Sequence, residues 1–219
     1  MRLDLTLDQL ENTVFCAKYR NFKRKLMRKM TKMTSSEIDC ALMLHYKFVL
    51  AHKERRNQYM TPSQLADFYQ IYFHMPNFNF VQEVIKYVDP SSKGAISAEG
   101  FVRLIEIWIY GSFADRMKFC FAVYDYPESG GFLTRYKVEI LCRNMVLAEL
   151  AEDQYDLLAS YVDFVFRKVD VDRDGLISYD DYAHVVTENP KLLQIFGPVI
   201  PDLEEMGAIL GQAKADPLP

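Results

Sequence analysis

Residues 170–181, which read DVDRDGLISYDD, gather five carboxylates around a single glycine. In a loop of this kind a hard cation such as Ca²⁺ takes oxygen ligands from positions 1, 3, 5, 7, 9 and 12, and the sixth residue is glycine because the chain turns sharply there. Gly175 stands at that sixth position. The spacing therefore predicts one cation site, whose ligands are Asp170, Asp172, Asp174, the backbone carbonyl of Leu176, Ser178 and Asp181.

The last ligand of this loop sets the expected affinity. Position 12 is usually a glutamate, whose longer side chain gives both oxygens to Ca²⁺. Asp181 is one methylene shorter, so we expect it to bind through one oxygen. A modest affinity for Ca²⁺, with Mg²⁺ as a competitor, follows from this difference.

The residues on either side of the loop have helical spacing. Val162, Val165 and Val169 precede it, and Tyr182 and Val186 follow it, at intervals that place each set on one helical face. The sequence therefore predicts a helix-loop-helix unit of the EF-hand type. The apolar eighth position of its loop should pair with a neighbouring loop.

Three earlier segments repeat this apolar pattern. The eighth positions of the four loops are Met60, Ile96, Leu133 and Ile177. The pattern predicts an all-α fold of four EF-hand-type units in two pairs. The predicted divisions are a basic amphipathic leader (1–34), a degenerate pair (35–108), a second pair with one competent loop (109–188) and an apolar C-terminal tail (189–219).

The first two loops have lost their ligands. In the second, Lys93 occupies position 5, where its ammonium repels a cation, and Gly100 occupies position 12. In the first, positions 1, 3 and 12 are Lys53, Arg55 and Gln64. We predict that this pair is wholly structural.

The third loop is disturbed rather than erased. Lys137 stands at position 12, and Pro127 lies in a loop with one extra residue. We expect a metal-free loop, and weak binding through Asp125, Glu128 and Ser129 is the alternative.

The N-terminal part of the chain is basic. Residues 1–60 carry 13 Lys and Arg against 6 Asp and Glu, whereas residues 61–219 carry 13 against 24. Residues 18–32 contain eight basic residues and no acid, and Phe22, Leu26, Met27 and Met30 recur among them at helical intervals. Such a helix can bind an acidic surface, or it can pack its apolar stripe on the first EF-hand pair. The candidate partner-binding residues are Lys23, Arg24, Lys25, Arg28 and Lys29.

The C-terminal tail is apolar and is interrupted by Pro198 and Pro201. Its cluster of Leu192, Leu193, Ile195 and Phe196 requires burial. The tail is therefore either a plug for the protein's own groove or part of a docking surface.

Composition narrows the function classes. No run of apolar residues is long enough for a membrane-spanning helix, and the four cysteines form no CxxC pair, so we expect a soluble intracellular protein. The chain contains no GxxxxGK[ST], GxSxG or HExxH motif, and its four histidines are scattered, so we expect no enzymatic activity.

Three stretches together resemble the calaxins, EF-hand proteins of motile cilia related to the neuronal calcium sensors. They are MKFCFAVYD (117–125), RKVDVDRDGLISYDDYAHVV (167–186) and IFGPVIPD (195–202), and the likeness covers residues 35 to about 205. The resemblance implies Ca²⁺ as the ligand and a place in the cytoplasm, on the cytoskeleton of the cilium or flagellum. Its implied partners are the outer dynein arm or its docking coiled coils, with tubulin as a further candidate, and neither nucleic acid nor membrane is expected.

Two departures from the calaxins weaken the expected calcium response. Calaxins usually keep more acidic second and third loops, whereas Lys93, Gly100, Pro127 and Lys137 stand in those loops here. The protein either responds weakly to Ca²⁺ or mainly holds a complex together. The competing hypothesis is a calcium-responsive adaptor, such as the regulatory subunit of a phosphatase or kinase.

Overall fold

The computed structural model describes residues 4, 6–51, 58–75, 80–125, 130–143 and 151–210. These residues form ten α-helices, one 3₁₀ turn and two short strands, which confirms the all-α fold class. In the described ranges, no helix combines the length and apolar character needed to cross a membrane. The chain falls into two compact units, Met1–Ser112 with Pro201–Pro219, and Phe113–Ile200.

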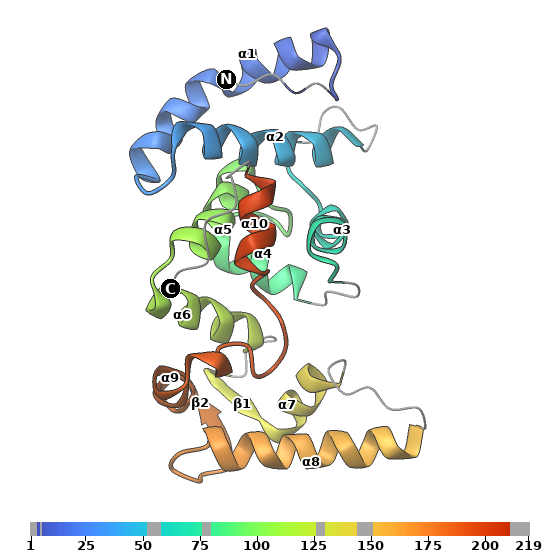
Figure 1. The fold of residues 1–219 in the computed structure, drawn as a ribbon, viewed down its shortest axis with the longest axis vertical. Helices are drawn as coiled ribbons and strands as arrows, with labels where there is room; N and C mark the ends of the chain where they lie inside the picture. Colours follow the sequence, from blue (N-terminus) through green and yellow to red (C-terminus); the bar gives the residue numbers. More distant parts are fainter. Residues whose placement is uncertain are drawn as a thin grey trace. The chain divides into compact units, whose positions relative to one another are not determined.

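The first unit contains six helices of the described chain (Figure 1). They are α1 (Gln9–Lys29), α2 (Ser35–Ala51), α3 (Pro62–Phe73), α4 (Val81–Val88), α5 (Ala98–Tyr110) and α10 (Leu203–Ile209). The loops before α3 and α5 meet in an antiparallel bridge between Met60 and Ile96. The two residues predicted to pair across the first two loops therefore do so.

Helix α1 begins earlier than the basic run suggested. Asp8 accepts a hydrogen bond of 2.7 Å from the Glu11 amide, and Glu11 reaches back to the Asp8 amide, so a capping box starts the helix. Phe15, Tyr19 and Leu26 are buried on the side that packs against α2. This packing realises the second alternative for the leader's apolar stripe, except that Met27 is 44% exposed.

The core of the first unit is aromatic. Trp108 of α5 is 1% exposed and packs against the rings of Phe68, Tyr69 and Phe73 of α3, at centroid distances of 5.4 to 6.4 Å. The short helix α10 lies against α3 and α5, where Met206 is buried (Figure 1). The end of the C-terminal tail thus covers part of this unit.

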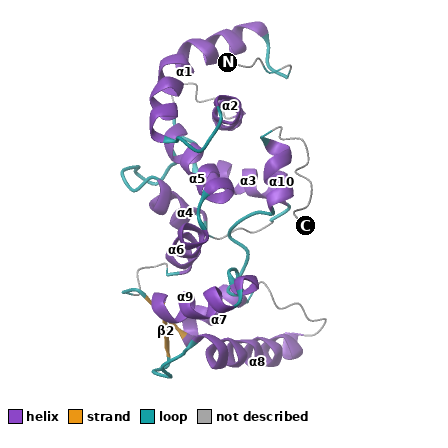
Figure 2. Ribbon diagram, turned by 60° about the vertical axis from the view of Figure 1, so that its left-hand side comes forward, coloured by secondary structure: helices purple, strands orange, loops and turns teal. Residues whose placement is uncertain are grey.

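The second unit joins its two loops by a short antiparallel ladder. Its elements are α6 (Phe113–Tyr124), β1 (Phe132–Thr134), α7 (Arg135–Cys142), α8 (Ala151–Val169), β2 (Leu176–Ser178), α9 (Tyr179–Glu188) and the 3₁₀ turn Pro190–Leu192. Leu133 of β1 faces Ile177 of β2, which confirms the predicted pairing of these eighth positions (Figure 2).

Residues 193–200 fill the interior of the second unit. Tyr182, Tyr161 and Tyr124 donate hydrogen bonds to the backbone carbonyls of Leu193, Ile195 and Gly197, at 2.6, 2.8 and 2.6 Å. Phe196 is 0% exposed and packs against the rings of Tyr124 and Tyr182. This part of the tail is a plug for its own unit.

Two predicted boundaries differ from the observed ones. The division after residue 108 falls inside α5, which continues to Tyr110 because the Tyr110 hydroxyl donates to Glu37 of α2 at 2.6 Å. The tail is also not a single segment, since residues 190–200 belong to the second unit and α10 to the first.

Candidate metal centre

The acidic loop between α8 and β2 brings three of its predicted ligands together. Asp170, Asp172 and Asp174 each offer a carboxylate oxygen, and these three oxygens lie within 4.8 Å of one another. Two oxygens on opposite sides of a Ca²⁺ ion bound at about 2.4 Å would be roughly 4.8 Å apart. The cluster therefore has the right size to surround one such ion.

A buried oxygen in the same cluster lacks a partner. Asp170 Oδ2 accepts a hydrogen bond of 3.0 Å from the Gly175 amide, but Asp170 Oδ1 is buried without any hydrogen bond. A buried carboxylate oxygen without a partner is costly, and a cation would satisfy it. The donor set, all hard oxygen, also suits Ca²⁺ or Mg²⁺. The residues of this loop thus fit the metal that the sequence predicts.

The loop backbone is shaped before any metal arrives. Gly175 has φ +85°, and Arg173 also has a positive φ of +61°. Asp172 Oδ1 accepts from the Asp174 amide at 3.2 Å, and Asp174 Oδ1 accepts from the Leu176 amide at 2.8 Å. These short-range bonds hold the carboxylates facing the centre of the loop.

The predicted closing ligand lies outside the three-carboxylate cluster. Asp181 Oδ2 accepts hydrogen bonds from the Ser178 amide at 2.9 Å and from the Ser178 hydroxyl at 2.5 Å. Asp181 Oδ1 accepts from the Val171 amide at 3.3 Å. Asp181 and Ser178 thus form the capping box of α9, and their roles as metal ligands stay a prediction. Binding would have to draw Asp181 out of this network, in keeping with a modest affinity.

The second loop shows how an EF-hand-type loop closes without metal. Asp89 at position 1 accepts hydrogen bonds from the Ser97 amide at 2.9 Å and from the Ser91 hydroxyl at 3.1 Å. A Cβ atom on Gly100 would lie 2.8 Å from the Cβ of Asp89. The glycine at position 12 therefore makes room for the carboxylate of position 1.

The other two loops are described only in part. Lys53 and Arg55 of the first loop, and Pro127, Glu128 and Ser129 of the third, lie outside the described residues. Gln64 is buried and donates to the Phe48 carbonyl at 2.6 Å, which is a structural role. The predicted weak binding in the third loop stays a prediction.

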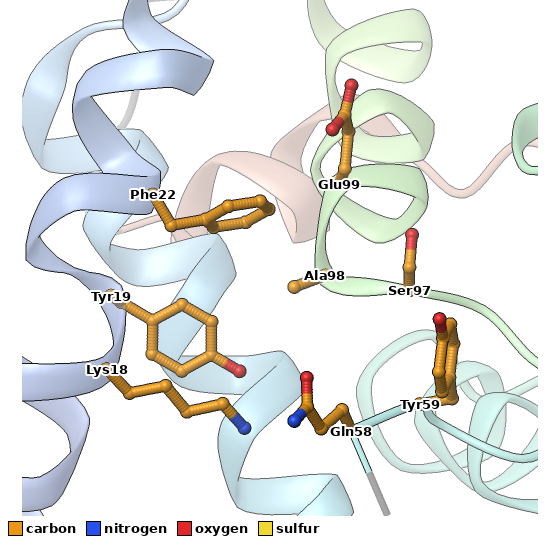
Figure 3. Close-up of a pocket in the computed structure, with 8 residues that line it drawn as sticks. All are labelled: Lys18, Tyr19, Phe22, Gln58, Tyr59, Ser97, Ala98 and Glu99. Atoms are coloured by element: carbon orange, nitrogen blue, oxygen red, sulfur yellow. The ribbon is translucent and has the colours of Figure 1, made fainter.

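A cavity of about 310 Å³ lies in the first unit, between α1 and the paired loops. Its lining includes the amine of Lys18 and the amide of Gln58 on one side and the carboxylate of Glu99 on another (Figure 3). Burial lowers the pKa of Lys18, and Glu99 forms an ion pair with Lys29 at 2.6 Å. A single paired carboxylate facing an amine is unsuited to a cation, so this cavity is no second metal centre.

The five candidate partner-binding residues of α1 have different environments. Lys23 is 8% exposed and pairs with Asp39 of α2 at 2.6 Å, so it stabilises the contact between the helices and is not available to a partner. Its position one turn from Tyr19 and Leu26 places it on the buried face. Arg24, Lys25, Arg28 and Lys29 are exposed.

Sequence reasoning missed two features of these sites. The exposed apolar residues Leu10 and Val14 precede the basic run on α1, and the Asp8–Glu11 capping box could have located them inside a helix. The replacement of position 12 by Asp89 had no signal beyond the glycine itself, because it depends on a contact between distant ends of the loop.

Comparison with known proteins supports the site assignment. The family described as an EF-hand domain pair matches residues 114–187, which include the acidic loop. Calaxin from Bos taurus is 26% identical over 201 residues, covering 89% of this chain and 94% of its own length. Calaxin from Homo sapiens is 25% identical over 205 residues, covering 89% and 96%. A regulatory-type relative, the B-type subunit of calcineurin from Schizosaccharomyces pombe, is 29% identical over 101 residues, covering 46% and 56%.

The calaxin matches span nearly the whole of both chains, and the EF-hand match falls on the unit that contains the carboxylate cluster. The EF-hand character of the first pair, which the family match does not reach, stays a prediction supported by the Met60–Ile96 bridge. The chain is a calaxin-like EF-hand protein, that is, a calcium-binding regulatory protein rather than an enzyme.

Proposed function

We propose that this protein is a calcium-binding structural and regulatory subunit of the outer dynein arm docking assembly on axonemal doublet microtubules. In that place Ca²⁺ would modulate ciliary or flagellar motility. The observation that carries the proposal is the similarity to calaxins over about nine-tenths of the chain. The presence of one carboxylate cluster of suitable size in the described residues supports a calcium-responsive element.

The second unit offers a route from the metal to the tail. The cluster would hold one Ca²⁺ ion, for which Mg²⁺ competes, and Asp181 would leave its bonds to Ser178 to complete the ligand ring. Asp181 stands in the first turn of α9, and the next residue, Tyr182, donates to the Leu193 carbonyl. Metal binding would therefore act on the helix that holds the plug in place.

The first unit offers the surface for the complex. Helix α1 carries four exposed cations, Arg24, Lys25, Arg28 and Lys29, on a helix that is anchored to α2 by buried aromatic side chains. Such a surface suits an acidic axonemal protein, whether a dynein arm component, a docking coiled coil or tubulin.

Co-sedimentation tests this function. The full-length protein is mixed with salt-extracted doublet microtubules and, separately, with microtubules polymerised from purified tubulin, with and without Ca²⁺. We expect saturable binding to doublets that the triple variant Arg24→Ser, Lys25→Ser, Arg28→Ser weakens. The control variant Lys118→Ser, Lys168→Ser, which removes exposed cations from the second unit, should bind like the wild type. Absence of saturable binding to doublets would contradict the axonemal role.

A second candidate is supported by the match to the calcineurin protein, which by its name is one subunit of a larger assembly. In this candidate the protein is a calcium-responsive adaptor or the regulatory subunit of a phosphatase or kinase. Calcium-dependent stimulation of a soluble phosphatase, without binding to doublets, would favour it. The match covers less than half of this chain, so we rank it second.

A further inference from the structure

A line of exposed residues runs along the outer side of α1. Its members are separated alternately by four and three positions: Leu10, Val14, Ala17, Asn21, Arg24 and Arg28. With 100° of rotation per residue, this line points in the direction opposite to Phe15, Tyr19 and Leu26, which are buried against the rest of the unit. We call these six residues the outer seam.

The spacing of the outer seam is that of a coiled-coil contact. A repeat of alternating four and three residues, which averages 3.5, keeps one face of a helix directed at a partner helix. The N-terminal half of the seam is apolar, with Leu10 72% exposed and Val14 47% exposed. Asn21 stands at its centre, and an asparagine in such a seam fixes the register of two helices. The pattern is therefore that of a helix face built for another helix.

The surface beside the seam is hollowed. An open hollow of about 890 Å³ lies between the N-terminal residues Asp4 and Leu7 and helix α1, and the seam residues Ala17 and Asn21 form part of its wall. Small side chains beside a hollow are what knobs-into-holes packing requires, because the large side chains of the partner need space to enter.

The C-terminal half of the seam carries unbalanced positive charge. Arg20, Arg24, Lys25 and Arg28 are all exposed, and within the described residues none of them forms an ion pair with a carboxylate. Arg24 donates to Asn21 at 3.4 Å. Arg20 and Lys25 flank the seam on opposite sides, where glutamates of a neighbouring helix would meet them.

We propose that the outer seam docks one α-helix of an acidic amphipathic partner, with apolar side chains over Leu10, Val14 and Ala17 and glutamates facing the basic half. The inference deepens the proposed docking function and rests on it for the place where such a helix is found. A disordered acidic tail would engage the arginines and lysines but would leave Leu10 and Val14 exposed, so the apolar half of the seam favours a helix.

Peptide binding to the full-length protein tests this site directly. The probes are a fluorescent synthetic peptide of about three heptads, with leucine at the seam positions and glutamate at the flanking ones, and a polyglutamate peptide of equal charge. We expect the helical peptide to bind and the polyglutamate peptide to bind at least tenfold more weakly. The double variant Leu10→Ser, Val14→Ser and the charge-reversal variant Arg24→Glu, Arg28→Glu should each weaken the helical peptide about tenfold or more.

The matched control is Met27→Ser, which removes an exposed apolar side chain from a different face of the same helix. It should leave peptide binding unchanged, and circular dichroism should show unchanged helix content in all variants. Lack of binding by the helical peptide would overturn the proposal. Equal binding of both peptides, unaffected by the Leu10→Ser, Val14→Ser variant, would overturn it in favour of a disordered acidic tail. If the helical peptide binds as expected while doublet microtubules do not, the docking site stands and the axonemal location fails.

Discussion

The carboxylate of Asp89 accepts a hydrogen bond of 2.9 Å from the amide of Ser97, which is the bond that Asp181 makes to Ser178 in the fourth loop. In both loops an acid thus caps the ninth residue, but it comes from position 1 in the second loop and from position 12 in the fourth. The first position of the second loop is therefore already engaged inside the protein. This loop is closed by its own side chain rather than by a cation.

Restoring the acid at position 12 of the second loop should not create a calcium site. A Cβ at residue 100 would lie 2.8 Å from Asp89 Cβ, so Gly100→Asp should destabilise the first unit by about 1–3 kcal/mol. Urea unfolding followed by Trp108 emission measures this, and Lys93→Asp, at an exposed position of the same loop, is the control with little expected effect. A stable double variant that binds Ca²⁺ would contradict our interpretation.

Lengthening the acid at position 12 of the fourth loop should tighten calcium binding. Asp181→Glu extends the side chain by one methylene, which allows both oxygens to reach Ca²⁺, so we expect about tenfold higher Ca²⁺ affinity without a gain for Mg²⁺. Calorimetric titration with each ion gives the comparison. Asp180→Glu, which changes the adjacent exposed acid, should leave both affinities as they are. Equal gains for both ions would show that Asp181 does not set the selectivity.

Acidification should destabilise the first unit through His45. This histidine is fully buried, its Nε2 lies 3.2 Å from the Ile96 carbonyl, its Nδ1 has no hydrogen-bond partner, and burial lowers its pKa to about 4. The unfolded chain, with a histidine pKa near 6.5, binds the proton more readily, so stability is full above that value and falls as the pH drops towards 4. We expect the unfolding free energy to decrease by about 2 kcal/mol between pH 7.5 and pH 5.

The His45→Leu variant isolates this effect. It removes the titrating ring but leaves the Ile96 carbonyl bonded to the Met60 amide at 2.9 Å. Urea unfolding at both pH values, followed by Trp108 emission, should show a smaller pH dependence in the variant. The same pH dependence in both proteins would assign it to other groups.

The plug should contribute strongly to the stability of the second unit. Phe196 is fully buried between Tyr124 and Tyr182, so Phe196→Ala should lower the unfolding free energy by about 3–5 kcal/mol. Pro198→Ala, an exposed change two residues away, should have little effect. Thermal unfolding followed by circular dichroism compares them. Similar losses for both variants would mean that the side chain of Phe196 is not what anchors the segment.

Local patterns predicted the parts of this structure that depend on local spacing. The eighth positions of the loops pair as expected because an apolar residue there has one partner strand, Met60 with Ile96 and Leu133 with Ile177. The carboxylates of Asp170, Asp172 and Asp174 converge because alternate positions of a turning loop face its centre. Helical spacing alone does not say which of several apolar residues faces the core, which is why Met27 is exposed although it belongs to the apolar pattern.

Features that depend on tertiary contacts were beyond sequence reasoning. Lys23 is buried because Asp39 on the next helix neutralises it, a pairing that the basic run conceals. The tail divides between the two units because three tyrosine hydroxyls bind its first part and α3 and α5 receive its second. The sequence shows an apolar segment that needs burial but not where that burial occurs.

The most direct test of the calcium site is an isothermal titration of the purified full-length protein with Ca²⁺, beside the variants Asp170→Ala and Asp202→Ala. Asp170 belongs to the carboxylate cluster, whereas Asp202 is an exposed acid outside it. We predict one binding site of modest affinity in the wild type and in Asp202→Ala, and none in Asp170→Ala. Absence of binding at millimolar Ca²⁺, or binding that survives Asp170→Ala, would contradict the assignment of this loop as the calcium site.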